Sequence, residues 1–149
     1  MAMRRPHLRL LLPLVLLAAC LALASGTPWT RLKNRFRWHH VDFPRSSVGF
    51  RNNYCDKMMW RRGIYGTLIN TFIHAPMRSI KRVCSVGGMH VSNGLRKSIF
   101  HFPVTTCRYK PYTDSYKEVK YPRQIVTIGC WNRLPVFYLE FPPYSLSAP

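Results

Sequence analysis

The chain opens with an apolar run from about residue 8 to residue 23, directly after the basic pair Arg4 and Arg5. Small residues follow at 24–26. This order is typical of a secretory signal peptide, which we place at residues 1–26, and it predicts a secreted, extracellular protein. The run is too short for a membrane-spanning helix of ~20 residues. The remaining segment, residues 27–149, has the size of one domain.

A helical pattern follows the leader. Leu32, Phe36 and His40 are spaced four residues apart, which places them on one face of a helix over residues 30–40. Residues 42–49 are rich in proline, serine and glycine and predict a loop.

Two more helices are expected further along the chain. Asn52 or Asn53 can cap a second helix, which Gly63 ends, and a third short helix follows Pro76. The residues expected on the inward faces are Tyr54, Met58 and Arg62 in the second helix, and Ile80 and Cys84 in the third.

The character of the sequence changes after residue 88. β-Branched and aromatic runs bounded by proline, glycine or asparagine occur at residues 99–102, 104–109, 125–128 and 136–141, and each predicts a strand. Helices first and strands later favour an α+β fold with an antiparallel sheet.

Four cysteines remain once Cys20 leaves with the signal peptide: Cys55, Cys84, Cys107 and Cys130. An even number in an oxidising compartment indicates two disulfides. Free or metal-binding cysteines are the alternative, but no two have the close spacing of zinc ligands. We therefore expect no metal and no cofactor.

The net charge narrows the class of partner. The full chain has 23 basic and 5 acidic residues, a formal charge of +18, and removal of the signal peptide leaves about +15. Such an excess favours RNA or other nucleic acid, anionic membrane surfaces or sulfated glycans. A solvated basic surface without a particular partner is the alternative.

Six segments carry a resemblance to a known family. They are residues 40–44, 54–63, 70–74, 78–81, 104–107 and 129–136, and three of them contain a cysteine. In this order they resemble the ribonuclease A superfamily, with most similarity to its angiogenin-like and avian or reptilian leukocyte members. The resemblance covers nearly the whole mature chain. It implies a monomeric domain of three helices with a curved antiparallel sheet.

The resemblance also implies the disulfide pairing. Two family bridges would join Cys55 to Cys107 and Cys84 to Cys130. A further bridge of the family has lost both ends, because Gly66 stands at its first position and a deletion follows Pro122. Each remaining bridge closes a long loop, which in the chain-entropy account stabilises the fold by ~4 kcal/mol.

Catalysis in the family needs two histidines and a lysine around one phosphate. One histidine takes the proton of the 2′-hydroxyl, the other protonates the leaving oxygen, and the lysine stabilises the charge on phosphorus. His40 matches the first histidine. Thr67 stands where the lysine is expected, and Phe137 stands where the second histidine is expected. The sequence therefore predicts an inactive or very weak enzyme, although His40 could equally be retained for structure.

Parts of a substrate groove are retained. Asn70 matches a neighbour of the phosphate and Thr71 matches the residue that reads a pyrimidine base in relatives. The alternative is that this segment is kept as a packed strand. His74 in the same segment is expected to be a structural, hydrogen-bonded histidine.

These features favour a non-enzymatic cationic protein that binds RNA and other polyanions, with host defence as a role. A weak pyrimidine-preferring ribonuclease is the second interpretation, and an angiogenin-like signalling factor is the third, based on the basic segments 60–63 and 78–81. The residues expected on the polyanion-binding surface are Arg61, Arg62, Arg78, Lys81 and Arg82.

Overall fold

The fold was analysed in a computed structural model, which describes residues 6–24 and 28–140. The helices are α1 (Pro6–Ala24), α2 (Pro28–His40), α3 (Tyr54–Arg61) and α4 (Met77–Lys81), the last followed by a 3-10 turn at Arg82–Cys84. The strands are β1 (Ile69–Ile73), β2 (Gly88–Ser92), β3 (Leu95–Ser98), β4 (Phe102–Lys110), β5 (Ser115–Gln124), β6 (Thr127–Trp131) and β7 (Leu134–Tyr138). Within the described residues, no helix has both the length and the apolarity needed to cross a membrane.

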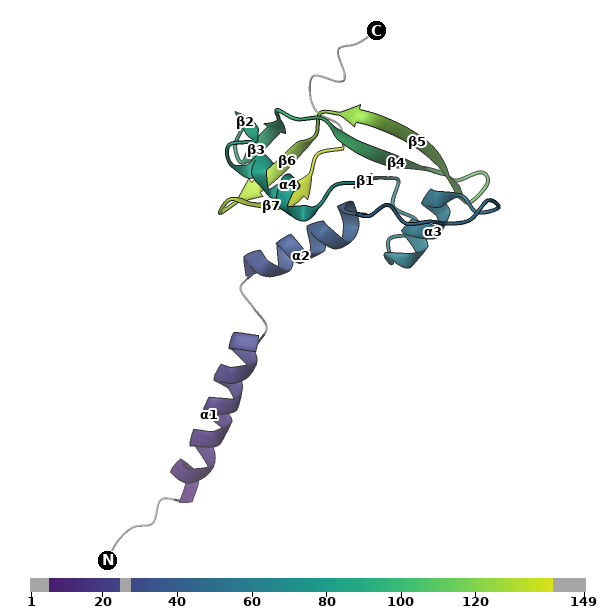
Figure 1. Ribbon diagram of the computed structural model, residues 1–149. Coiled ribbons are helices and arrows are strands. Elements are labelled where there is room, and N and C mark those ends of the chain that lie inside the picture. The colour runs from purple at the N-terminus through teal and green to yellow at the C-terminus, as the bar shows by residue number, and fades with distance from the viewer. Residues whose placement is uncertain (1–5, 25–27, 141–149) are drawn as a thin grey trace, which may run out of the picture.

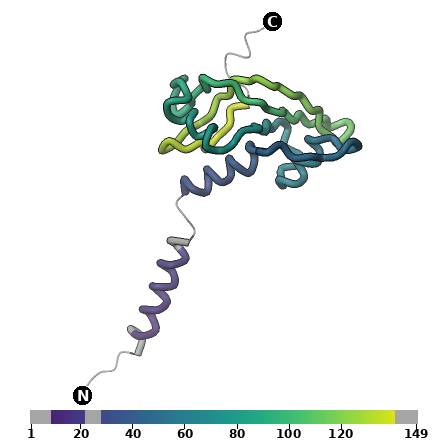
Figure 2. The backbone as a smooth tube through the Cα atoms, viewed as in Figure 1, coloured from purple at the N-terminus to yellow at the C-terminus, as the bar shows by residue number. Residues whose placement is uncertain are grey.

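The strands form two antiparallel sheets. One has the order β1-β4-β5 and the other the order β2-β3-β6-β7 (Figure 1). The expected single curved sheet is thus divided in two. Strands β4 and β5 run side by side along the length of the domain (Figure 2). The four-stranded sheet forms one end of the domain, and α3 with the β4–β5 turn forms the opposite end (Figure 1).

The expected helices are present with small changes at their ends. Asn53 is the residue that caps α3, because its side-chain oxygen accepts hydrogen bonds from the backbone N–H groups of Cys55 and Asp56. Ile80 of α4 is fully buried, as its spacing predicted. Arg62 is the C-cap residue of α3, where its backbone N–H donates to the Met58 carbonyl, and its largely buried side chain lies inward as expected.

The strand predictions were less accurate. Residues 104–109 lie within β4, but the expected strand at 99–102 is wrong, because Ile99 and Phe100 are exposed in a bend between β3 and β4. Strands β2, β3 and β5 were not predicted. They are short or rich in exposed polar residues, so none has the run of β-branched and aromatic residues that indicated β4. Gly26 and Phe141 lie outside the described residues.

Two clusters of buried side chains hold the elements together. The larger contains Phe36 of α2, Ile80 of α4 and the inward side chains of the four-stranded sheet, Ile128 and Tyr138 among them. The smaller joins α3 to the three-stranded sheet through residues such as Tyr54 and Phe72. Burial of this apolar surface is the main favourable term for folding.

The disulfides have the implied pairing. Cys55 of α3 is linked to Cys107 of β4, and Cys84 is linked to Cys130 of β6, so one bridge crosses each cluster. Gly66, at the site of the lost family bridge, has a φ of 97°, a conformation that disfavours residues with a Cβ. Among the described residues, no group of three His, Cys, Asp or Glu side chains is arranged to hold a metal ion.

Candidate functional site: one retained histidine and its surroundings

His40 is held at the C-terminal end of α2 by contacts on several sides. Its Nδ1 atom lies 3.0 Å from the Thr71 carbonyl oxygen of β1, and since a carbonyl can only accept, Nδ1 donates the proton. Its ring stacks on Tyr138 of β7 with 5.3 Å between centroids and lies near Phe36 of its own helix. This geometry leaves Nε2 unprotonated and able to act as a base.

Burial also sets the charge of His40. It lowers the pKa of His40 from 6.5 to about 4, against an opposing contribution from the hydrogen bond to Thr71, while His39 lowers the pKa further. The imidazole is therefore neutral at pH 7. It can accept a proton in principle, but it contributes no positive charge to a phosphate site.

The lowered pKa makes the stability of the domain depend on pH. Below the unfolded-state pKa of 6.5 the unfolded chain gains a proton that folded His40 takes up only near pH 4, so stability is lost as the pH falls through that window. The free energy of unfolding should therefore decrease between pH 6.5 and about 4, and replacing His40 with Asn should make this decrease smaller by about 2–3 kcal/mol. Urea denaturation at several pH values measures the free energy of unfolding of each variant. The control is His90→Asn, at an exposed position on β2. The same pH dependence in both variants would contradict this account.

The hydrogen-bond donors of Thr71 are bound to another part of the chain. Its backbone N–H donates to Glu140 Oε1 at 2.8 Å, and its hydroxyl donates to Glu140 Oε2 at 2.6 Å. Burial raises the pKa of Glu140, while the hydrogen bonds from Thr71 and the charge of Arg108 oppose that change. The two donors that the resemblance assigns to a pyrimidine base are thus already satisfied within the protein.

Sequence reasoning did not find Glu140. Its contact with Thr71 spans 69 residues, which no local pattern encodes. The available signal was its isolation, since no acidic residue lies between Glu118 and Glu140. The Glu140 carboxylate also lies 3.9 Å from the His40 imidazole, so both groups share one largely buried space.

Asn70 has a structural contact in the surroundings of His40. Its side-chain amide donates to the His39 carbonyl at 2.8 Å and is almost fully buried, so it fastens β1 to the end of α2. The segment 70–72 is therefore a packed strand, in agreement with the structural alternative.

The two replaced catalytic positions add no charged group to the surroundings of His40. Thr67 lies exposed in the turn before β1, and its carbonyl accepts a hydrogen bond from the Tyr116 hydroxyl. Phe137 projects from β7 on the face opposite to Tyr138 and covers Gly129, where a Cβ would lie 3.0 Å from the Phe137 Cβ. Among the described residues, the surroundings of His40 thus contain one base and neither the second histidine nor the lysine.

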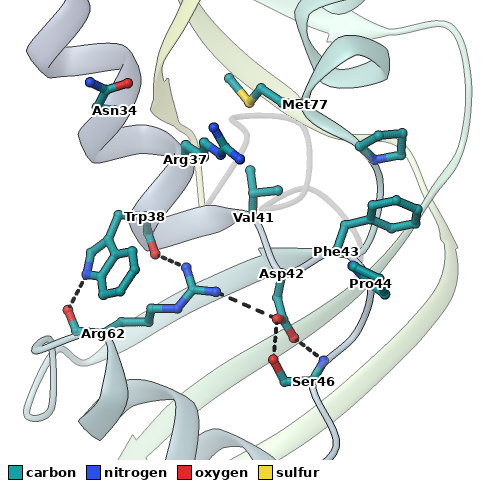
Figure 3. Close-up of a pocket in the computed structure, with 11 residues that line it drawn as sticks. Asn34, Arg37, Trp38, Val41, Asp42, Phe43, Pro44, Ser46, Arg62 and Met77 are labelled. Atoms are coloured by element: carbon teal, nitrogen blue, oxygen red, sulfur yellow. Dashed lines mark hydrogen bonds and ion pairs between the residues drawn. The ribbon is translucent and has the colours of Figure 1, made fainter.

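A second hollow, of about 670 Å³, lies beside the end of α2 and is lined by Arg37, Trp38, Asp42, Ser46 and Arg62 among others (Figure 3). Its charges are mostly paired. The Arg62 guanidinium donates to the Trp38 carbonyl, lies over the Trp38 ring and is 3.6 Å from the Asp42 carboxylate. Ser46 donates twice to the same carboxylate. The hollow is therefore a structural junction between α2 and α3.

His74 belongs to the same junction. Its ring nitrogens lie 2.9 Å from the Asp42 carbonyl and 2.8 Å from the Thr105 hydroxyl, and the Tyr54 hydroxyl donates to the Asp42 carboxylate at 2.5 Å. Burial lowers the pKa of His74, so this ring is also held as a neutral, hydrogen-bonded group. The expectation of a structural histidine is confirmed.

The five expected polyanion-binding residues lie at two places. Arg61 is on α3, and Arg78, Lys81 and Arg82 are exposed on and just after α4. Arg62 is different, because the contacts with Trp38 and Asp42 hold its guanidinium in place. The sequence could not show this, since Trp38 and Arg62 are 24 residues apart.

An α+β domain with these sheets, two such disulfides and a histidine held by a strand carbonyl defines the class of small secretory-type ribonuclease folds. The chain belongs to the pancreatic ribonuclease family, whose model matches residues 31–139. A ribonuclease of Chelydra serpentina is 37% identical over 115 residues, covering 70% of this chain and 92% of that one. Angiogenin of Gallus gallus is 35% identical over 130 residues, covering 83% and 88%. The crystal structure of green turtle egg white ribonuclease aligns with a TM-score of 0.67 at 34% identity, covering 73% and 97%.

Proposed function

We propose that this protein is a secreted cationic member of the pancreatic ribonuclease family that binds RNA and other polyanions without cleaving RNA at a significant rate. One observation carries the proposal. The single retained histidine is mostly buried and neutral, Thr67 and Phe137 replace its two catalytic partners, and the donors of Thr71 are bound to Glu140. Host defence outside the cell is a role that such a protein would suit.

Charge supports the binding half of the proposal. The mature chain has 20 basic and 5 acidic residues, so it attracts phosphate and sulfate polymers from a distance. Asp42 and Glu140 are engaged in internal contacts, which further reduces the negative charge that an approaching polyanion meets. Binding by charge needs no base recognition, and the contact of Glu140 with Thr71 argues against such recognition.

Weak ribonuclease activity is the second candidate, and the Nε2 atom of His40 favours it. This atom carries no proton, because Nδ1 donates to the Thr71 carbonyl, so it is the nitrogen that can accept the 2′-hydroxyl proton. Without a positioned acid for the leaving oxygen, the rate should fall by about 10²–10⁴. Without the lysine the charge on phosphorus is also less stabilised.

A cleavage assay on refolded residues 27–149 tests the proposal. With polyuridylic or polycytidylic acid, the rate should be at least about 10²-fold below that of an active family member. Binding of the same RNA, followed separately in low salt, should remain measurable. Robust cleavage that His40→Ala abolishes would contradict the proposal and favour the second candidate.

A further inference from the structure

Large apolar side chains are exposed together at one end of the domain. Trp29 of α2 stacks on Trp131 of β6 with ring centroids 4.9 Å apart and planes at 21°. Trp131, Phe137 and Leu95 line one open hollow of about 530 Å³. The exposed fractions are 37% for Trp29, 55% for Trp131 and 53% for Phe137. We call these four residues, Trp29, Leu95, Trp131 and Phe137, the aromatic face.

The sheet register explains why this face is exposed and continuous. Leu95 pairs with Gly129, and Gly129 pairs with Phe137, so the three residues lie on the same face of the sheet. The opposite face contributes Ile128 and Tyr138 to the buried core. Because Gly129 has no side chain, the Phe137 ring lies directly over its backbone and joins the apolar surface on either side.

The charge around the aromatic face has one sign. Helix α2 and strands β2, β3, β6 and β7 contain no acidic residue. Basic residues lie close in sequence to both tryptophans, with Lys33 one turn after Trp29 and the exposed Arg133 two residues after Trp131. At the opposite end of the domain both signs are present, since the hollow beside α3 is lined by Asp56 and Asp114 together with Arg51, Lys57 and Arg61. Complementary charge therefore favours an anionic partner at the aromatic end.

The chemistry of the face favours lipid over nucleic acid. The two indole rings stack on each other, which covers one side of each and reduces the area that a base could stack on. Leu95 provides apolar surface but no ring. Amphipathic indoles beside cations suit the boundary between lipid headgroups and acyl chains, where tryptophan is favoured.

We propose that the aromatic face docks the domain on anionic lipid bilayers, with Trp29, Trp131 and Phe137 entering the interface while Lys33 and Arg133 meet the phosphate headgroups. The inference rests on the proposed function, since it names an anionic lipid surface as one of the polyanionic partners. It adds the orientation of the domain on the bilayer. The four-stranded sheet faces the bilayer, and α3 with the β4–β5 turn points away from it.

The test compares two double variants of the mature chain. Trp29→Ser with Trp131→Ser removes the stacked pair, and Trp60→Ser with Tyr112→Ser removes two exposed aromatic side chains from the other end. Neither changes the net charge. Binding is measured by sedimentation with vesicles of phosphatidylcholine and phosphatidylglycerol, and with single-stranded RNA. Circular dichroism and thermal unfolding check that both variants fold.

The first variant should lose about tenfold in vesicle affinity, because less apolar area enters the interface, and should retain its RNA affinity. The control variant should bind vesicles like the wild type. Lipids brominated in their acyl chains should quench tryptophan fluorescence in the wild type and the control, but not that of Trp38 and Trp60 remaining in the first variant.

Three results would overturn the inference. Equal vesicle affinity of both variants would show that the aromatic face does not insert. Loss of RNA affinity without loss of vesicle affinity in the first variant would identify the face as a platform for bases. Quenching that persists in the first variant would place another surface in the membrane. A wild-type chain that binds neither vesicles nor RNA would instead contradict the proposed function itself.

Discussion

A chain carrying Thr67→Lys, Phe137→His and Glu140→Ala together is expected to cleave polyuridylic acid at least about 10³ times faster than the unmutated chain. Phe137→His places an imidazole at the position that the family resemblance assigns to the acid, and Thr67→Lys places a positive charge at the position that it assigns to the lysine. Glu140→Ala frees the backbone N–H and hydroxyl of Thr71, which are otherwise bound to the carboxylate. Initial rates of cleavage measure the effect.

The gain in cleavage rate should be much larger for the triple variant than for any single change, because the effects of groups that act on one phosphate are not additive. Thr67 and Phe137 are both exposed, so neither replacement disturbs the core. The control adds His40→Ala to the triple variant and should abolish the gain. A triple variant no faster than the unmutated chain, or one that His40→Ala leaves active, would show that the surroundings of His40 cannot position these groups.

RNA affinity of the unmutated chain should fall about a hundredfold between roughly 50 and 200 mM salt if it contacts five phosphates, since each contact contributes about −0.7 to the slope of log affinity against log salt. Replacing four residues with Gln should flatten that slope: Arg61, Arg78, Lys81 and Arg82. Arg62 is left unchanged because it joins α3 to α2. Fluorescence anisotropy with labelled oligonucleotides over a salt series measures the slope of log affinity against log salt.

A charge-matched control separates a binding surface from net charge. Four exposed basic residues elsewhere are replaced with Gln: Arg35, Lys110, Lys117 and Arg123. If the first set forms part of the surface, its slope should flatten more than that of the control. Equal slopes would mean that RNA contacts the whole basic surface. A salt-insensitive affinity, or strong preference for one RNA sequence, would contradict binding by charge.

Local pattern and covalent chemistry allowed much of the fold to be predicted. The spacing of Leu32, Phe36 and His40 indicated α2, and the apolar run at 104–109 indicated the centre of β4. Four cysteines in the mature chain indicated two disulfides, and the family resemblance indicated their pairing. These features could be predicted because periodicity and cysteine number are properties of short segments or of composition.

The candidate site was predicted in part. The resemblance pointed to His40 and to the two replaced catalytic positions, which needs only the order of motifs along the chain. It did not show that His40 is neutral, because that depends on burial beneath Tyr138 and Phe36. Strands β2, β3 and β5 were missed because pairing with a neighbouring strand, rather than a run of β-branched and aromatic residues of their own, makes them strands.

By itself, then, the sequence determined a basic, disulfide-linked α+β domain of the ribonuclease type with an incomplete set of catalytic groups. The tertiary structure decided which of its polar groups are available. Glu140 reaches Thr71 across 69 residues, Arg62 is held by Trp38, and Trp29 stacks on Trp131 across 102 positions. Contacts at such separations depend on how the two sheets and α2 pack, because hydrogen bonding and burial act between surfaces that only the folded chain brings together.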